Sequence, residues 1–181
     1  METLGQIIGI VAAAMIILSF QAKDTVKLYI IQTIGGVLFA ISFFMLGSTT
    51  AALLNLIGLP RGIILTAGPK WNKWYVLVAI EAAILAIGIF SYAGYLSIVT
   101  VCAQLVGTAA LWTRKGKMIR ILQFCVVSPL WLFNNIMSFA IGGIITEVVS
   151  MMSVIVSIIR FGFNGFEDAP KQKKSKEAGN A

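Results

Sequence analysis

The cations of this chain fall in every second gap between its apolar runs, and this alternation narrows most sharply what the chain can fold into. The runs occupy about residues 4–20, 28–46, 50–66, 74–90, 96–112, 119–139 and 143–161. Lys and Arg are found in or beside the first, third and fifth gaps and from the end of the seventh run onward, whereas the other gaps contain none. Because short cytoplasmic loops retain Lys and Arg, the pattern predicts seven membrane spans, with the N-terminus outside and the C-terminus in the cytoplasm.

The composition also favours a membrane protein over a soluble one. Hydrophobic residues make up 59% of the chain and charged residues 12%, and a helix needs about 20 apolar residues to cross the hydrocarbon core. Backbone groups in lipid must be paired within the segment, so each run is expected to be helical. Aromatic residues suited to interfacial anchoring lie at both predicted surfaces: Tyr92 and Tyr95 at one, and Trp71, Trp74 and Trp112 at the other. The predicted fold class is all-α, a polytopic membrane protein with seven transmembrane helices.

An internal repeat organises the predicted spans. A shift of 93 positions aligns Lys27 with Arg120 and places the first three spans on the last three without a gap. Two parallel repeats with one span between them give a 3+1+3 arrangement, related by an axis along the membrane normal, although any seven-helix bundle can produce such a layout by chance. The predicted domain covers residues 1–162, with repeat 1 at about 4–66, a linker helix at about 74–90 and repeat 2 at about 96–161. Residues 163–181 are predicted to be a disordered, basic cytoplasmic tail.

Polar residues inside the spans must be satisfied by protein or water, and several are expected to meet in one layer. In the predicted topology Asn55, Asn135, Ser138 and Glu147 all lie about one helical turn below the outer surface, and Trp131 shares a helix face with Asn135. Taken singly, the serines are better explained as packing residues that let helices approach closely. Glu147 is harder to explain in that way, because a carboxylate in the core must be paired, protonated or near the interface.

Two further predictions concern the inner parts of the spans. Glu81 and Arg61 lie at similar depths, so a structural ion pair between them is expected. Pro129 removes a backbone donor within a span, and it aligns with Gly35-Gly36 in the repeat. These three residues are therefore expected to act as hinges at matching depth.

The last two spans carry a series of residues at fixed spacing: Trp131, Asn135, Ile141-Gly142-Gly143, Glu147 and Arg160. With this series, and with Leu53–Asn55 earlier in the chain, the sequence resembles the YgjV-type family of bacterial inner-membrane proteins. It departs from the family pattern at Asn134, where a His is expected, and at Val154 and Ser157, where Asn is expected. The resemblance implies a multi-pass inner-membrane protein, distantly similar to the SWEET and PQ-loop proteins, although the chain has no Pro-Gln dipeptide.

The favoured function is a transporter or facilitator of a small polar solute, with its site between the two repeats. The expected substrate-binding residues are Asn135, Glu147, Asn55, Trp131 and Ser138. The alternative is a non-transporting membrane protein that assembles with a partner, in which case the polar layer is architectural. An enzyme is not expected, because the chain has no His and no Ser or Cys with an evident general base.

The remaining expectations concern partners and cofactors. The net charge of +7 is explained by cations in cytoplasmic loops, so the lipid bilayer is the expected partner and nucleic acid is not. No cofactor or metal is expected, since Cys102 and Cys125 lie in separate spans without metal-ligand spacing and are read as buried thiols. A homo-oligomer is left open.

Overall fold

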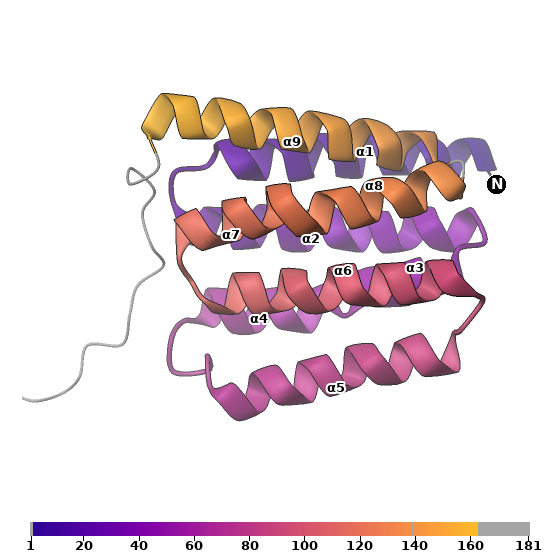
Figure 1. Cartoon of the computed structure of the whole chain (residues 1–181), viewed down its shortest axis with the longest axis horizontal. Coiled ribbons are helices and arrows are strands. Elements are labelled where there is room, and N and C mark those ends of the chain that lie inside the picture. The colour runs from indigo at the N-terminus through magenta and orange to yellow at the C-terminus, as the bar shows by residue number, and fades with distance from the viewer. Residues whose placement is uncertain (1, 139, 163–181) are drawn as a thin grey trace, which may run out of the picture.

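The computed structural model describes residues 2–138 and 140–162, and the predicted tail at 163–181 lies outside them. The described chain is helical and runs back and forth along one axis (Figure 1). Its elements are α1 (Glu2–Gln21), α2 (Thr25–Met45), α3 (Thr49–Leu56), α4 (Gly58–Ala67), α5 (Trp74–Phe90), α6 (Tyr95–Trp112), α7 (Gly116–Leu122), the π-helical turn η1 (Gln123–Val127), α8 (Ser128–Met137) and α9 (Ile141–Phe161).

Within the described residues, 6 helical segments are long and apolar enough to cross a bilayer. Four of these are α1, α2, α6 and α9; the other two are formed jointly by α3 with α4, and by α7 with η1 and α8. The remaining apolar helix, α5, has 17 residues, which is the lower limit of about 17 residues for a span. The structure is thus that of a polytopic membrane protein, and a count of seven spans stays a prediction.

Both composite segments change their helical geometry just before a proline. α3 ends at Leu56 and α4 begins at Gly58, so the break at Ile57 lies three residues before Pro60. Pro60 has no N–H that could bond to the carbonyl of Leu56. The π-helical turn η1 ends immediately before Ser128 and Pro129. By contrast, α2 continues unbroken through Gly35 and Gly36. The helix thus changes its geometry beside Pro129 but not at Gly35 and Gly36, and the matching hinges stay a prediction.

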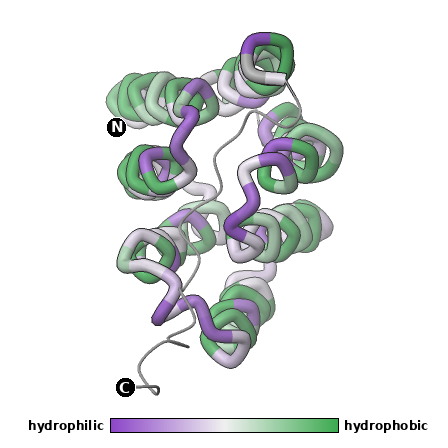
Figure 2. Tube along the Cα trace, turned by 90° about the vertical axis from the view of Figure 1, so that its left-hand side faces the viewer, coloured by the Kyte–Doolittle hydropathy of each residue, from purple (hydrophilic) through white to green (hydrophobic). Residues whose placement is uncertain are grey.

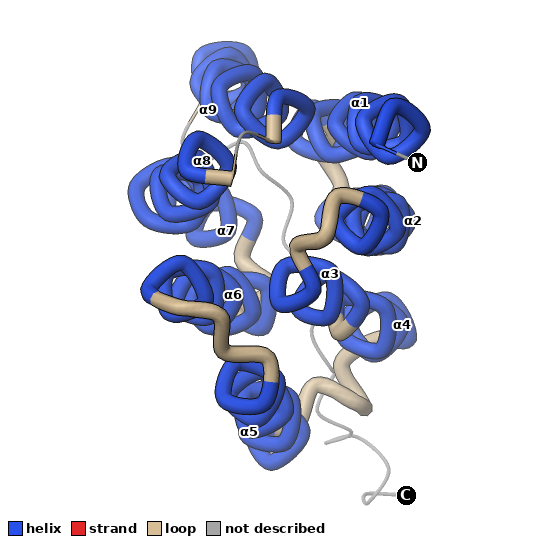
Figure 3. Tube along the Cα trace, turned by 90° about the vertical axis from the view of Figure 1, so that its right-hand side faces the viewer, coloured by secondary structure: helices blue, strands red, loops and turns tan. Residues whose placement is uncertain are grey.

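The helices form two rows that face each other. The first row comprises α1, α2 and the α3–α4 segment, with α2 packed between the other two; the second row comprises α6, the α7–α8 segment and α9, with α7–α8 in the middle. α9 lies along α1, and α6 contacts α3 and α4, so the two rows close into a ring (Figure 3). α5 lies outside this ring, against α6 and α3.

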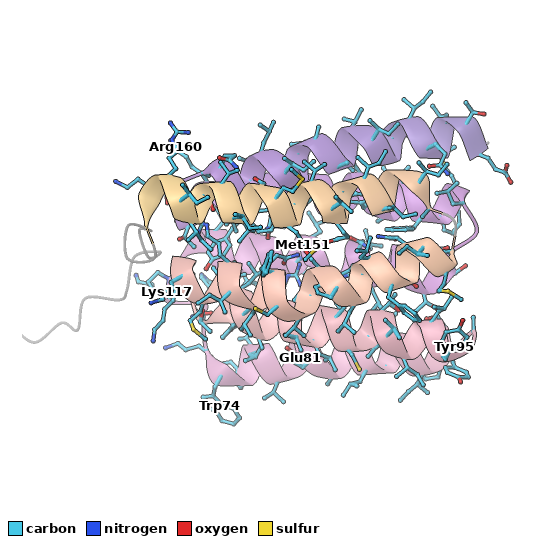
Figure 4. The ribbon with its side chains drawn as sticks, turned by 45° about the horizontal axis from the view of Figure 1, so that its top comes forward. Trp74, Glu81, Tyr95, Lys117, Met151 and Arg160 are labelled. Carbon is cyan, nitrogen blue, oxygen red and sulfur yellow. The ribbon has the colours of Figure 1, made fainter. Side chains whose placement is uncertain are left out.

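The two ends of the bundle differ in charge. The end with the α1–α2, α4–α5 and α6–α7 loops, here called the basic end, holds Lys23, Lys70, Lys115, Lys117 and Arg160. Figure 4 shows Lys117 and Arg160 at this end and Tyr95 at the opposite end, and the loops of the basic end are strongly hydrophilic (Figure 2). In the described part of the chain the opposite end has no Lys or Arg. The cations therefore gather at one end in the fold, as their spacing predicts.

The exterior of the bundle is apolar, as expected for a surface that contacts lipid. Large side chains such as Phe90 and Ile159 are 90% and 78% exposed, whereas soluble proteins rarely expose contiguous apolar patches of this kind. Cys102 and Cys125 lie on this exterior, so the expectation of buried thiols is wrong. Trp112 is also misassigned as an anchor: it is buried in the core, where Asn72 of the α4–α5 loop donates a hydrogen bond to its carbonyl.

Candidate functional site

A cavity of about 110 Å³ lies between the two rows. Every segment of the ring contributes to its lining, whereas α5, which the structure describes in full, contributes none. One lining residue from each segment illustrates the arrangement: Phe20 (α1), Gln32 (α2), Asn55 (α3), Gln104 (α6), Asn135 (α8) and Glu147 (α9). The central cavity is thus shared by both rows, and amide and carboxylate side chains line it among aromatic rings.

Four of the five predicted substrate-binding residues line this one cavity: Asn55, Trp131, Asn135 and Glu147. They converge because each lies at a similar distance from the opposite end of the bundle. Ser138 does not line it, because α8 ends at Met137 and Ser138 no longer follows its helical face. The cavity also contains Gln32, Gln123 and Arg61, which the sequence analysis did not assign to the site; their signal is an amide or a charge inside an apolar span.

Two acceptor atoms in the cavity wall are buried and lack a hydrogen-bond partner among the described residues. They are Oδ1 of Asn135 and Oε2 of Glu147. The two side chains are neighbours, because Asn135 packs directly on Gly143, one turn of α9 from Glu147. Most buried polar groups are hydrogen-bonded, and leaving one unpaired costs about 1–3 kcal/mol. This part of the wall is therefore shaped to accept a hydrogen bond from a donor in the cavity.

The Glu147 carboxylate is held from its other side by a short polar chain. The Ser128 hydroxyl hydrogen-bonds to Glu147, and Gln123 Nε2 donates to the Ser128 oxygen at 3.0 Å. Ser128 can do both because a hydroxyl accepts and donates at once. The carboxylate is thereby positioned by residues of the second row, while its Oε2 atom has no hydrogen-bond partner within the described residues.

Arg61 is the cation in the cavity wall. Its Nη1 donates to Thr108 Oγ1 at 2.8 Å, which joins α4 of the first row to α6 of the second. Glu81 of α5 attracts it electrostatically from outside the ring, although no hydrogen bond links the two side chains within the described residues and Glu81 Oε1 is buried without a partner there. The proposed structural ion pair stays a prediction, with charge attraction but no direct hydrogen bond behind it.

A second hollow, of about 210 Å³, opens at the opposite end of the bundle. Ser138 and Asn134 line this end hollow together with Ala51 and Thr100. Ala51 and Thr100 precede the cavity residues Asn55 and Gln104 by four positions, which is one helical turn. The end hollow therefore lies one turn beyond the central cavity, and Ser138 belongs to this outer compartment.

The basic end is tied across the two rows by three side chains whose contacts the sequence did not reveal. Tyr29 of α2 donates its hydroxyl to Leu111 O of α6 at 3.0 Å. Arg114 donates to Leu65 O of α4 at 2.8 Å and lies over the Tyr29 ring. Arg120 of α7 is fully buried and donates to Ala22 O, just past α1, at 2.7 Å. These three contacts are here called the basic-end bridge.

Together, the apolar exterior, the long helices and the internal polar cavity define a polytopic α-helical membrane protein. Its sequence matches the family model described as Imp-YgjV, bacterial inner membrane protein, over residues 3–164. The chain therefore belongs to the Imp-YgjV family and is an integral protein of the bacterial inner membrane. No curated protein and no solved structure matches it, so a similarity to the SWEET or PQ-loop proteins has no support from these comparisons.

Proposed function

We propose that this protein carries a small polar solute across the inner membrane, and that the solute binds in the central cavity. The observation behind the proposal is that one cavity unites Asn55, Asn135 and Glu147 from both rows of helices. Polar groups inside a membrane are costly and usually mark a solute or ion path. Here they face inward, while the exterior is apolar.

The cavity sets the size of the solute. An apolar cavity of about 150 Å³ binds benzene, which has six heavy atoms, so a cavity of about 110 Å³ suits a solute of about four or five. A solute of this size needs few contacts, and the cavity offers amide, carboxylate and guanidinium groups. Facilitated diffusion is favoured over ion coupling, because charged groups are few in the cavity wall and form no continuous line.

In this proposal the basic-end bridge closes the basic end, and it opens when one row moves against the other. The solute would reach the cavity from the end hollow, and its release at the basic end requires the contacts of Tyr29, Arg114 and Arg120 to break. The acceptors of these three contacts are all backbone carbonyls of the other row. The contacts can therefore reform without a rearrangement of acceptor side chains. The 3+1+3 repeat is part of this proposal, since two equivalent rows around one site would move as rigid units.

The alternative function, assembly with a partner protein, predicts polar residues on the lipid-facing surface. Asn135 is 2% exposed and lines the cavity instead. The same geometry therefore weighs against a polar layer that serves a partner, although homo-oligomerisation through the apolar exterior stays open.

The test is a thermal-unfolding screen of the purified protein against polar metabolites, followed by uptake of each hit into proteoliposomes. A ligand at 100 times its Kd should add about 2.7 kcal/mol to native stability. We expect a hit that stabilises the wild type, is taken up, and does neither in the Asn135→Ala and Glu147→Gln variants. A library without hits, together with two variants that are less stable than the wild type, would assign the polar residues to architecture.

A further inference from the structure

We propose that the solute is recognised through a protonated amino group, which binds to Glu147 and Asn135 beside Trp131. This inference deepens the proposed function by naming the chemical class of the solute. It rests on the same cavity, but it concerns binding and can be tested without transport.

The unpartnered atoms favour a ligand that donates hydrogen bonds. Asn135 Oδ1 and Glu147 Oε2 are both acceptors, and neither has a partner within the described residues. A carboxylate on α9 and an amide oxygen on the neighbouring helix α8 are complemented by a group with several N–H donors and a positive charge. A protonated amine carries three donors on one atom, so a single ammonium group can satisfy both oxygens.

The charged groups in the cavity wall favour a cationic ligand. Arg61 and Glu147 line the cavity, but they differ in their surroundings. Arg61 is attracted by Glu81 from outside the ring, and it already donates to Thr108. Glu147 contacts the neutral Ser128, and no ion pair within the described residues engages it. With Glu81 offsetting the charge of Arg61, the charge left in the cavity wall is that of the Glu147 carboxylate, which favours a cationic head group over a carboxylate.

An aromatic wall lies beside the two acceptors. Trp131 precedes Asn135 by four positions and therefore shares its helix face. Its indole stacks on the Phe43 ring, with centroids 6.1 Å apart, and both residues line the cavity. The face of an indole ring attracts a cation, most strongly where water is excluded. Trp131 can therefore add to the stabilisation of an ammonium group held by Glu147.

The test uses the full chain in lipid nanodiscs and three probes with a common propyl or propionyl skeleton. Propylammonium, 1-propanol and propionate offer a cation, a neutral hydroxyl and an anion at closely similar size, and sodium chloride keeps the ionic strength equal. We expect propylammonium to raise the unfolding temperature in a saturable way, with a measurable Kd by calorimetry. The alcohol and the carboxylate should leave the unfolding temperature unchanged.

Three variants locate the binding. Glu147→Gln keeps the shape of the side chain and should weaken propylammonium binding about tenfold or more, because a buried charge partner is lost. Asn135→Asp adds a second carboxylate and should tighten binding. Glu2→Gln removes an equal charge from the exposed start of α1 and should change nothing. The two site variants are expected to change the affinity for propylammonium in opposite directions. If one of them fails to fold, the affinity of the other still tests the inference.

Several outcomes would overturn the inference: equal stabilisation by 1-propanol or by sodium ions, preferential binding of propionate, or unchanged affinity in Glu147→Gln or Asn135→Asp. The result is separable from the proposed function. Binding of propylammonium without uptake of any amine would leave the inference standing and refute the carrier. Uptake of a neutral solute without amine binding would refute the inference and leave the carrier.

Discussion

Gly143 and Asn135 are in direct contact across the α8–α9 interface, so closely that a Cβ atom on Gly143 would lie 2.5 Å from Cγ of Asn135. The absence of a side chain at position 143 is what allows the Asn135 amide to sit beside α9 and reach the cavity wall. The contact joins the two helices that carry the unpartnered acceptors.

This contact predicts that Gly143→Ala destabilises the protein by about 1–3 kcal/mol, because an overpacked interface must shift. The unfolding free energy in micelles is the measurement. Gly142→Ala is the matched control, since its Cβ would meet atoms no closer than 3.6 Å. Adding Asn135→Ala to Gly143→Ala should recover part of the loss; strictly additive losses would contradict the contact.

The basic-end bridge predicts an effect of Tyr29→Phe on both stability and access. Loss of the hydroxyl that bonds to Leu111 O should cost about 1 kcal/mol, whereas Tyr95→Phe, on the exposed opposite end, should cost nothing measurable. In a background without Cys102 and Cys125, a cysteine at the cavity position Gln123 should react faster with a maleimide in the Tyr29→Phe variant. An unchanged reaction rate would mean that the bridge does not limit access.

The attraction between Arg61 and Glu81 predicts coupling in a double-mutant cycle. We expect the effects of Arg61→Met and Glu81→Gln on the unfolding free energy to be non-additive by about 1 kcal/mol, within the range for interacting neighbours. The paired change should be milder than the sum, because each single variant leaves an uncompensated charge in the bundle. Additive effects would show that the two residues are near each other without forming a structural pair.

The clustering of cations at one end predicts the orientation in the membrane. Single cysteines at Lys115, in the α6–α7 loop, and at Ala93, in the α5–α6 loop, are both exposed and lie at opposite ends. In intact spheroplasts lacking the native cysteines, an impermeant maleimide should label Ala93→Cys, and should label Lys115→Cys only after permeabilisation. The reverse pattern would place the basic end outside, against the rule for short loops.

The helices and the cavity were predictable to different degrees. Apolar runs and their gaps are local signals, so the predicted run at 74–90 coincides with α5 and the run at 143–161 lies within α9. The depth of Asn55, Asn135 and Glu147 along their spans predicted that they lie together. Helices that cross the same membrane rise by the same distance per residue, so equal depth in the sequence means equal depth in the bundle. Ser138 was misplaced, since the end of α8 at Met137 depends on a turn that the run of apolar residues did not reveal.

The contacts between the two rows could not be predicted from the sequence. Arg114 was predicted to lie in a cytoplasmic loop and Arg120 at the edge of the following run, yet their acceptors lie 49 and 98 positions away in the chain. Trp112 was predicted to be an interfacial anchor, yet it is buried, and Asn72 of the α4–α5 loop donates to its carbonyl. In each case burial is decided by which segments meet, and no local pattern in the sequence carries that information.

The position of α5 outside the ring has a consequence for how such a fold can arise. A row of three helices begins at one end of the bundle and finishes at the other, so a second row joined directly to the first would run upside down. α5 returns the chain to its starting end, and both rows then run in the same direction (Figure 1). Without α5, the two rows would have to enter the membrane separately and in the same orientation to give this arrangement. Within the described residues, α5 is therefore the helix that lets one continuous chain supply both rows in the same direction.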